Sequence, residues 1–493
     1  MIRLIKTFIL LITLLLGFSC SKDSYVEPFF ECKEHSVLLD AQIDASEEFV
    51  FSTNMEWNIT TSSKFFDVYP TSGKGAADIR ITLTARQDNT TQNDRDLGEL
   101  WIHTSNGQKY LIRVMQDSGI ASQTILLYMP GKQLLKDYNR NIKQCVEAVS
   151  NGCLGKGRIV ICYQPDNEQS ALVKELSYNK KTSTCDVKTI HQIADFHAES
   201  PRSVKDLFEF VAEYAPAKRY GLIIGSHGKA WIPASKSLRS IMSFGVISEE
   251  EFWRPHPSAL KTRSFGDPKH ELEVGQFSEV LSQLTFRFDF LIFDACFMSN
   301  IETLYDLRKH FDYIVASPCE IMAAGFPYNR ILPHLYAQED PRKFLAAACH
   351  TYWDFYQNHW EEVSKNAQSG CIALTQTNQI EALAAVMRQI NPRMKKVADK
   401  DSVQVYEGLS THVFYDMGHY VVQYGGDQTD IDRFNEQMDR CFPKDGRFHT
   451  DQFYSGANGK MNDIVYYSGV SFSELSDRYP ELNQQTAWYR ATH

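Results

Sequence analysis

The chain has 493 residues, of which 43% are hydrophobic and 12% are aromatic. This composition excludes a disordered chain and supplies enough apolar side chains for the cores of two or three domains. The formal net charge is −10, and the 51 basic side chains form no long run that could follow a phosphate backbone. We therefore expect no nucleic-acid partner.

Residues 1–20 have the pattern of an export signal. Arg3 and Lys6 precede an apolar run over 8–16 that is too short to span a bilayer as a mature helix. Cys20 directly follows Ser19, which resembles the cleavage box of bacterial lipoproteins, although Gly17 stands where leucine is usual. A lipid on Cys20 would anchor the protein to the bacterial outer membrane or the cell surface. Plain secretion without a lipid and a retained transmembrane anchor are the alternatives.

Residues 21–36 are expected to be a linker, and residues 37–118 a small all-β domain. In the second range, strand-sized apolar bursts such as 49–51, 79–83 and 110–114 are separated by turn residues. Short alternating strands at this spacing predict an immunoglobulin-like sandwich.

The same segment resembles the BACON domain, a module common in exported proteins of Bacteroides-type bacteria. The matching positions are Trp57, the turn 70–73, Asn89, Arg95 and the closing residues 114–116. Carbohydrate binding has been proposed for that family. We favour a spacer, because the sequence shows no exposed aromatic platform.

From residue 123 onward, apolar runs alternate with stretches of helix length. The strand-like runs are 124–129, 158–163, 220–224, 288–293 and 313–316, and Ser200-Pro201 is a helix start signal. Near-continuous apolar strands are typical of buried parallel sheets, so this part is predicted to be α/β with helices on both faces. We expect residues 370–493 to complete the fold without contributing chemistry.

Eleven cysteines are present, but their odd number and irregular spacing assign no disulfide. No CxxC pair occurs, so the sequence predicts no zinc site and we name no metal ligand.

Two of the buried strands end in reactive side chains. The run 220–224 leads into His227-Gly228, and the run 288–293 leads into Asp294-Ala295-Cys296. Ligands of open α/β sheets bind beyond the carboxyl ends of the strands, so a histidine and a cysteine there can share one crevice. A histidine can take the proton of a thiol, and the amides of Gly228 and Cys296 are candidate oxyanion donors. Taken by residue type alone, such a cysteine and histidine are more often core residues.

These two motifs resemble the clostripain family of caspase-fold cysteine peptidases, with a match from about 124 to at least 328. The resemblance implies a caspase-like, mostly parallel sheet flanked by helices, and a catalytic dyad of His227 and Cys296. It places Asp294 in the pocket for the residue before the cleaved bond, the P1 residue, and Ser317 at the wall of that pocket. A carboxylate there would pair with arginine or lysine. A strand-end carboxylate that caps local amides is the other reading of Asp294.

The resemblance also implies a monomer that acts on proteins or peptides and needs no cofactor for its chemistry. Several relatives depend on calcium, so a calcium requirement rests on the resemblance alone. The sequence departs from the family pattern on both sides of His227. Ser226 stands where many relatives have an acidic residue, and Lys229-Ala230-Trp231 follow His227-Gly228 where they have a second glycine.

The interval between His227 and Cys296 is longer than two strands and a helix require, so residues 236–269 are predicted to be an insertion. Relatives are commonly activated by self-cleavage in this interval, after a basic residue. Lys261 and Arg263 are the preferred processing candidates. A charged surface loop without regulatory meaning is the alternative.

Two other functions compete with a protease specific for basic residues. The α/β domain could be an inactive scaffold on a surface protein whose sandwich binds a glycan or a partner. It could also be a cysteine hydrolase with another P1 preference, whose activity would not depend on Asp294.

Overall fold

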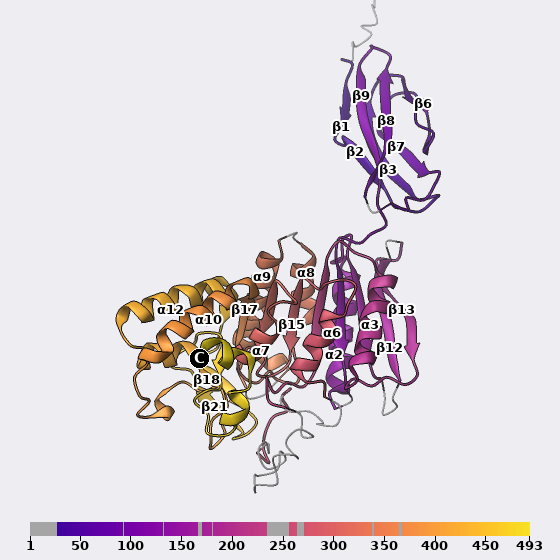
Figure 1. Cartoon of the computed structure of the whole chain (residues 1–493). Coiled ribbons are helices and arrows are strands. Elements are labelled where there is room, and N and C mark those ends of the chain that lie inside the picture. Colours follow the sequence, from indigo (N-terminus) through magenta and orange to yellow (C-terminus); the bar gives the residue numbers. More distant parts are fainter. Residues whose placement is uncertain are drawn as a thin grey trace, which may run out of the picture. The chain divides into compact units, whose positions relative to one another are not determined.

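The computed structural model describes residues 27–91, 93–131, 133–165, 170–179, 181–233, 256–263, 271–337, 340–363 and 367–493. They fall into two units, one ending at Ile120 and one beginning at Ala121 (Figure 1). Cys20, the export signal and most of the insertion predicted over 236–269 lie outside the described residues.

The N-terminal unit consists of two β-sheets, in the part of it that is described. One sheet has the strand order β2 (Ser36–Leu39), β9 (Lys109–Gln116), β8 (Arg95–Thr104), β4 (Trp57–Thr61) and β6 (Ser72–Gly73). The other has the order β1 (Phe30–Cys32), β3 (Ser46–Thr53), β7 (Ala76–Ala85) and β5 (Phe66–Tyr69). Alternate residues of each strand face a shared core, in which Phe51 and Trp57 pack edge to face at 5.2 Å.

One expectation about this unit is corrected. Residues 30–32 fall in the predicted linker but form β1, which pairs with residues 51–53 of β3. Phe30 packs on Phe51 with ring centroids 5.5 Å apart. A strand of three residues is too short to show the alternation by which strands are recognised in a sequence.

The second unit is built on a large mixed sheet. Among the described residues its order is β13 (Thr184–Ile193), β12 (Ala171–Asn179), β11 (Arg158–Tyr163), β10 (Thr124–Met129), β14 (Tyr220–Gly225), β15 (Phe290–Asp294), β16 (Tyr313–Ala316), β17 (Ile372–Gln376) and β19 (Arg447–Phe448). The central strands β11, β10, β14, β15 and β16 are parallel, and the strands beyond them pair antiparallel. This arrangement confirms the predicted α/β fold.

Helices cover both faces of this sheet. One face is covered by α3 (Pro201–Tyr214), α6 (Val274–Ser282), α7 (Ile301–Leu307), α10 (Ile380–Ile390) and α12 (Gln428–Cys441). The other is covered by α2 (Leu135–Ser150), α8 (Tyr328–Ala337) and α9 (Pro341–Asn358). Successive strand residues point to opposite cores, so Leu291 and Phe293 face the first group while Phe290 and Ile292 face the second. The start of α3 is as predicted, because the Ser200 side chain accepts a hydrogen bond from the Ser203 amide.

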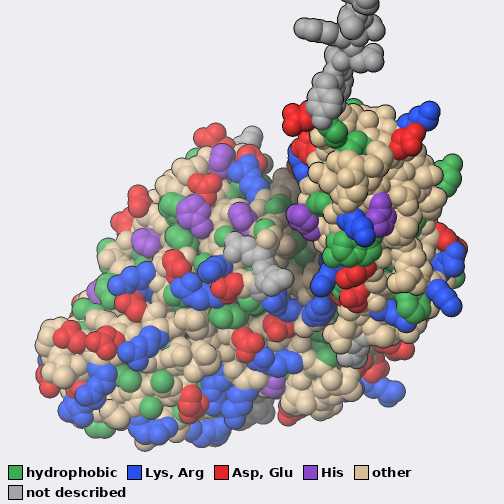
Figure 2. Space-filling model, turned by 90° about the horizontal axis from the view of Figure 1, so that it is seen from above, with side chains coloured by type: hydrophobic (Ala, Val, Ile, Leu, Met, Phe, Trp, Pro, Cys, Tyr) green, Lys and Arg blue, Asp and Glu red, His purple; other side chains and the backbone are tan. Residues whose placement is uncertain are grey.

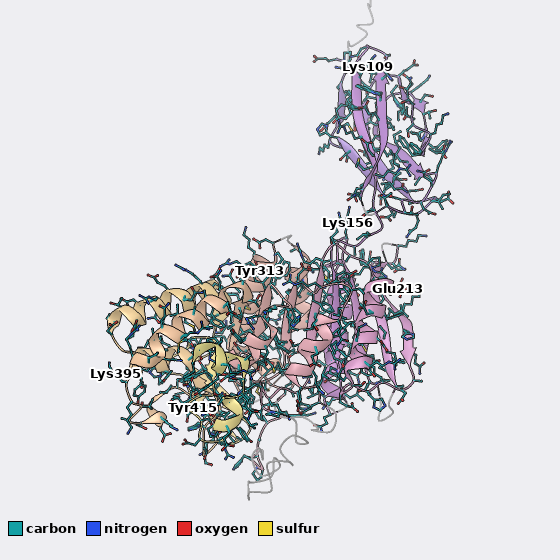
Figure 3. The ribbon with its side chains drawn as sticks, viewed as in Figure 1. Lys109, Lys156, Glu213, Tyr313, Lys395 and Tyr415 are labelled. Carbon is teal, nitrogen blue, oxygen red and sulfur yellow. The ribbon has the colours of Figure 1, made fainter. Side chains whose placement is uncertain are left out.

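The C-terminal part adds short elements at one end of the sheet, coloured orange to yellow in Figure 1. The helices are α11 (Met417–Tyr424), α13 (Pro480–Asn483) and α14 (Ala487–Thr492), and the strands are β18 (Tyr415–Asp416), β20 (Gln452–Ser455), β21 (Lys460–Asp463) and β22 (Ser471–Phe472). Short 3₁₀ turns occur at Trp360–Glu362, Thr377–Gln379, Asn391–Arg393, Lys400–Ser402 and Lys444–Gly446. Side chains fill the space between these elements, with Tyr313 at the start of β16 and Tyr415 in β18 labelled in Figure 3.

The surface shows mixed charge. On the face seen in Figure 2, acidic and basic side chains are interspersed. Of the helices within the described ranges, none is both long and apolar enough to cross a membrane.

Candidate active site

His227 and Cys296 follow neighbouring parallel strands. Gly225 of β14 is paired with Asp294 of β15, so the two loops leave the sheet side by side. A side chain at Gly228 would place its Cβ 2.3 Å from the Cys296 carbonyl oxygen and 3.0 Å from the Cys296 nitrogen. Only glycine allows this approach, which brings the Gly228 and Cys296 amides together.

The Cys296 thiol is fully buried. Its sulfur accepts a hydrogen bond from the Ile321 amide at 3.1 Å and lies 3.5 Å from the Ile321 carbonyl oxygen. Burial raises the pKa of this thiol well above its usual value, and the Glu320 carboxylate raises it further. In this arrangement the thiol is protonated near neutral pH.

The cover over Cys296 is a piece of the predicted insertion. Residues 261–263 run antiparallel to residues 321–323, with the Arg263 amide donating to the Ile321 carbonyl at 2.8 Å and the Ala323 amide donating to the Lys261 carbonyl at 3.0 Å. Further back, the Leu260 amide donates to the Tyr454 hydroxyl at 2.5 Å. The segment therefore lies as an added strand along the chain that follows β16.

The Arg263 side chain enters a pocket behind the thiol. Both Arg263 and Asp294 are completely buried, and the Arg263 Nη1 lies 2.9 Å from the Asp294 Oδ2. Burial alone would lower the pKa of the guanidinium, but the Asp294 carboxylate reverses this effect and raises it. Arg263 is therefore charged and directly paired with the residue assigned to the P1 pocket.

Every nitrogen of the guanidinium finds an acceptor. Nε donates to the Ala323 carbonyl at 3.2 Å, Nη1 to the Asp294 carbonyl at 3.1 Å and Nη2 to the Asn141 Oδ1 at 2.8 Å. The Tyr138 ring lies 5.9 Å from the guanidinium carbon. A buried charge is tolerated only when it is paired and hydrogen-bonded in this way.

Two further residues of the pocket donate hydrogen bonds to the Asp294 carboxylate. The Tyr328 hydroxyl donates to the Asp294 Oδ2 at 2.8 Å and the Phe326 amide does so at 3.3 Å. Gly325 has a φ of 69°, and a Cβ there would lie 2.2 Å from the Arg263 Nη2. Glycine at this position is thus required both by the backbone conformation and by the space that the guanidinium occupies.

The backbone of Arg263 is held as precisely as its side chain. Its carbonyl oxygen accepts a hydrogen bond from the Gly228 amide at 3.0 Å. The amide expected to serve as an oxyanion donor thus points at the carbonyl of a basic residue.

The unusual loop after His227 is anchored at two points. Lys229 is buried and forms an ion pair with Glu271. The Trp231 indole donates to the Ser473 hydroxyl at 2.9 Å, and the Ser473 amide donates to Glu302 at 2.8 Å. Burial raises the pKa of Glu302 to about 7. Glu302 thus links α7 to the backbone of the C-terminal part.

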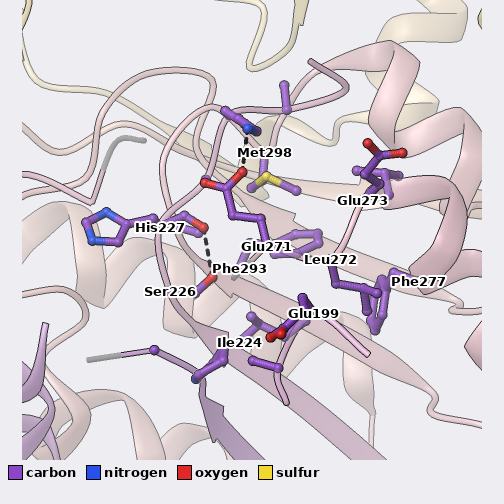
Figure 4. A pocket seen from close by; sticks show the side chains of 18 of the residues that line it. Glu199, Ile224, Ser226, His227, Glu271, Leu272, Glu273, Phe277, Phe293 and Met298 are labelled. Carbon is purple, nitrogen blue, oxygen red and sulfur yellow. Dashed lines mark hydrogen bonds and ion pairs between the residues drawn. The ribbon is translucent and has the colours of Figure 1, made fainter. Parts of the chain in front are cut away.

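A second cavity, of about 380 Å³, opens beside His227 (Figure 4). Its walls include Ser226, His227 and Gly228 together with apolar side chains such as Leu272 and Phe277. In Figure 4 the His227 imidazole points away from Leu272 and Phe277. Cys296 and Asp294 are not among the residues that line this cavity.

Two further residues were named from the sequence, Ser317 and Lys261. The Ser317 hydroxyl is buried and exchanges hydrogen bonds with the backbone of Cys319, at 3.0 and 3.2 Å, so its place in the pocket wall stays a prediction. Lys261 is exposed, and its Nζ donates to the Gln133 carbonyl at 2.7 Å. Of the two processing candidates, the structure brings only Arg263 to Asp294.

Sequence reasoning missed several residues of the site. Asn141 and Tyr138 come from α2, and Glu320 from the chain after β16. Tyr454 belongs to the C-terminal part, and its hydroxyl accepts the hydrogen bond from Leu260. That residues 370–493 contribute no chemistry stays a prediction. Asn141 is a polar residue on the buried face of an amphipathic helix, and that pattern is the one signal that points to it.

Metal ligands are not grouped in the part of the chain that the structure describes. No three His, Cys, Asp or Glu side chains there gather closely enough to hold a metal ion. The calcium requirement raised by the sequence resemblance has no support.

The fold and the residues at its strand ends define a cysteine peptidase of the caspase-like class. A model of the clostripain family matches residues 128–441, and the chain belongs to that family. The chain is similar to a secreted C11 cysteine protease from Bacteroides thetaiotaomicron, with 28% identity, a TM-score of 0.65 and coverage of 76% of this chain and 99% of the other. An inactive zymogen C11 protease from Parabacteroides distasonis shares the fold, with 23% identity, a TM-score of 0.61 and the same coverage. No curated protein sequence matches.

The buried thiol predicts slow alkylation in the uncut chain. With iodoacetamide at pH 8, we expect Cys296 to react at least about tenfold more slowly than the half-exposed Cys185, because the thiolate is the reactive form. Raising the pH should speed both reactions. The measurement is mass spectrometry of the labelled peptides, with the uncut state verified by intact mass. Equal rates for the two cysteines would contradict the burial of Cys296.

Proposed function

We propose that the protein is an exported cysteine endopeptidase that cleaves after arginine or lysine, with Cys296 as nucleophile and His227 as general base. One observation carries this proposal. Arg263 lies with its guanidinium on Asp294 and its carbonyl oxygen on the Gly228 amide, as the P1 residue of a substrate would. Residues 261–263 of the chain thus occupy the positions that we propose for the substrate.

The chemistry follows from this placement. The Cys296 sulfur attacks the carbonyl carbon of the P1 residue while His227 takes the thiol proton. The negative charge that develops on the carbonyl oxygen is stabilised by the Gly228 amide, with the Cys296 amide as the second donor. His227 returns the proton to the leaving amine as the carbon–nitrogen bond breaks, which leaves a thioester. Water then hydrolyses the thioester and restores the thiol.

The same placement supports activation by self-cleavage after Arg263. While Arg263 fills the pocket, no other basic side chain can reach Asp294. Cleavage of the bond between Arg263 and Ser264 would make Arg263 a carboxyl terminus, which could then leave the pocket. Lys261, the other candidate, would serve as the residue two positions before P1.

Self-cleavage predicts a defined cut. The wild-type chain should yield one fragment that ends at Arg263 and one that begins at Ser264, read by mass spectrometry. Arg263→Ala should abolish this cut because Asp294 loses its partner, and Cys296→Ala should stay intact. Lys261→Ala is the matched control and should still be cut. A cut after Lys261, with the Arg263–Ser264 bond intact, would contradict the proposal.

The pocket favours arginine over lysine at P1. An arginine uses three separate nitrogens to reach Ala323, Asn141 and Asp294, whereas a lysine ammonium is shorter and has no fork. Asn141 is therefore the residue that separates the two substrates.

Peptides test this preference. Under reducing conditions the wild type should hydrolyse Arg- and Lys-terminated fluorogenic peptides but not their Asp or Asn counterparts, and Cys296→Ala should hydrolyse none. Asn141→Ala should lower kcat/KM about tenfold for the arginine peptide, the usual effect of losing a hydrogen bond to a charged group, and much less for the lysine peptide. Lys143→Ala, on the exposed face of the same helix, is the control. Failure to cleave any basic peptide would favour an inactive scaffold.

Export and membrane attachment are part of the proposal. They are supported by the signal-like residues 1–20 and by the relative described as a secreted protease. We propose that lipid on Cys20 anchors the enzyme and that the N-terminal β unit, which resembles a BACON domain, is a spacer.

Metabolic labelling checks the anchor. Cells that express the full chain should incorporate labelled palmitate into the protein and retain it in the membrane fraction. Cys20→Ser should lose the label and be released. A label that persists in Cys20→Ser would exclude this site.

A further inference from the structure

A buried carboxylate faces the residue that precedes Arg263. The Thr262 hydroxyl donates to the Glu320 Oε2 at 2.6 Å, and both side chains are buried. Neither the proposed chemistry nor the P1 pocket uses this contact. Thr262 would be the P2 residue if Arg263 is P1.

The rest of Glu320 is fixed by the C-terminal part of the chain. Its Oε1 accepts from the Gly456 amide at 2.7 Å and from the Ser455 hydroxyl at 2.9 Å. These two bonds set the plane of the carboxylate and leave Oε2 directed at Thr262. Both donors, a backbone amide and a buried serine hydroxyl, belong to the C-terminal part and not to residues 261–263.

The space around this oxygen is small. A Cβ at Gly456 would lie 3.1 Å from the Glu320 Oε2 and 3.7 Å from the Thr262 Oγ1. A hydroxyl on a Cβ reaches Oε2 directly, whereas a long lysine or arginine side chain would have to displace the wall formed by Ser455 and Gly456. The geometry therefore suits a short side chain that carries a hydrogen-bond donor.

We propose that Glu320 is a specificity-determining residue that selects threonine or serine at P2. This inference rests on the proposed cleavage after basic residues and extends it to the preceding position. A substrate without the hydroxyl would lose the 2.6 Å hydrogen bond to Oε2, and sites built to bind a hydroxyl reject analogues that lack it. The preferred sequence before the cleaved bond is thus Thr-Arg or Ser-Arg, as in the chain itself.

Four peptides with the sequence Leu-Lys-X-Arg and a fluorogenic leaving group test the selection on the wild-type enzyme, where X is threonine, serine, valine or lysine. Valine has the shape of threonine without the hydroxyl. We expect kcat/KM for threonine to exceed that for valine at least about tenfold, with serine above valine and lysine below threonine. This comparison needs no variant, so it does not depend on the folding of a mutant.

Glu320→Gln then assigns the effect to the carboxylate. The neutral amide keeps the shape, so we expect the threonine-to-valine ratio to fall several-fold while the arginine-to-lysine preference at P1 stays as in the wild type. Three outcomes would overturn the role of Glu320 and leave the proposed function standing. They are equal rates for threonine and valine in the wild type, faster cleavage with lysine than with threonine at P2, and an unchanged threonine-to-valine ratio in Glu320→Gln. Absence of cleavage of every arginine peptide would overturn the proposed function as well.

Discussion

The ion pair between Arg263 and Asp294 is the contact on which the rest of the site depends. Removing two charges from water is costly, and here the cost is offset by direct pairing and by hydrogen bonds from the guanidinium to Asn141 and Ala323 and from Tyr328 to the carboxylate. Loss of one partner from such a pair typically costs about 3–5 kcal/mol, because the other charge is left buried and unpaired. This penalty holds the segment 261–263 over the thiol.

In the proposed function, specificity and latency share one set of contacts. The pocket that would recognise a basic substrate is filled by the chain's own arginine. The Cys296 thiol is fully buried, and burial raises its pKa well above the usual value. In the proposed function, cleavage after Arg263 converts this cover into a departing product. In that proposal the segment 261–263 is both the inhibitor and the first substrate, so no separate inhibitory domain is needed.

The C-terminal residues are part of the site and not only of the scaffold. Tyr454 binds the backbone of the covering segment, Ser455 and Gly456 orient Glu320, and Ser473 holds Trp231 in the loop after His227. The central strands lead into His227 and Cys296, while distant parts of the chain shape the pockets around them.

The amino-acid sequence by itself determined the α/β fold of the second unit and the location of His227, Cys296 and Asp294 at strand ends, because buried parallel strands appear as apolar runs. It left Lys261 and Arg263 equivalent, since both are basic residues in one irregular stretch. Only the tertiary structure distinguished them, by placing Arg263 on Asp294 and Lys261 at the surface. Asn141, Glu320 and Ser455 could not be found from the sequence for the same reason. Periodicity reports which face of an element is buried, but contacts between residues far apart in the chain are decided by how the elements pack.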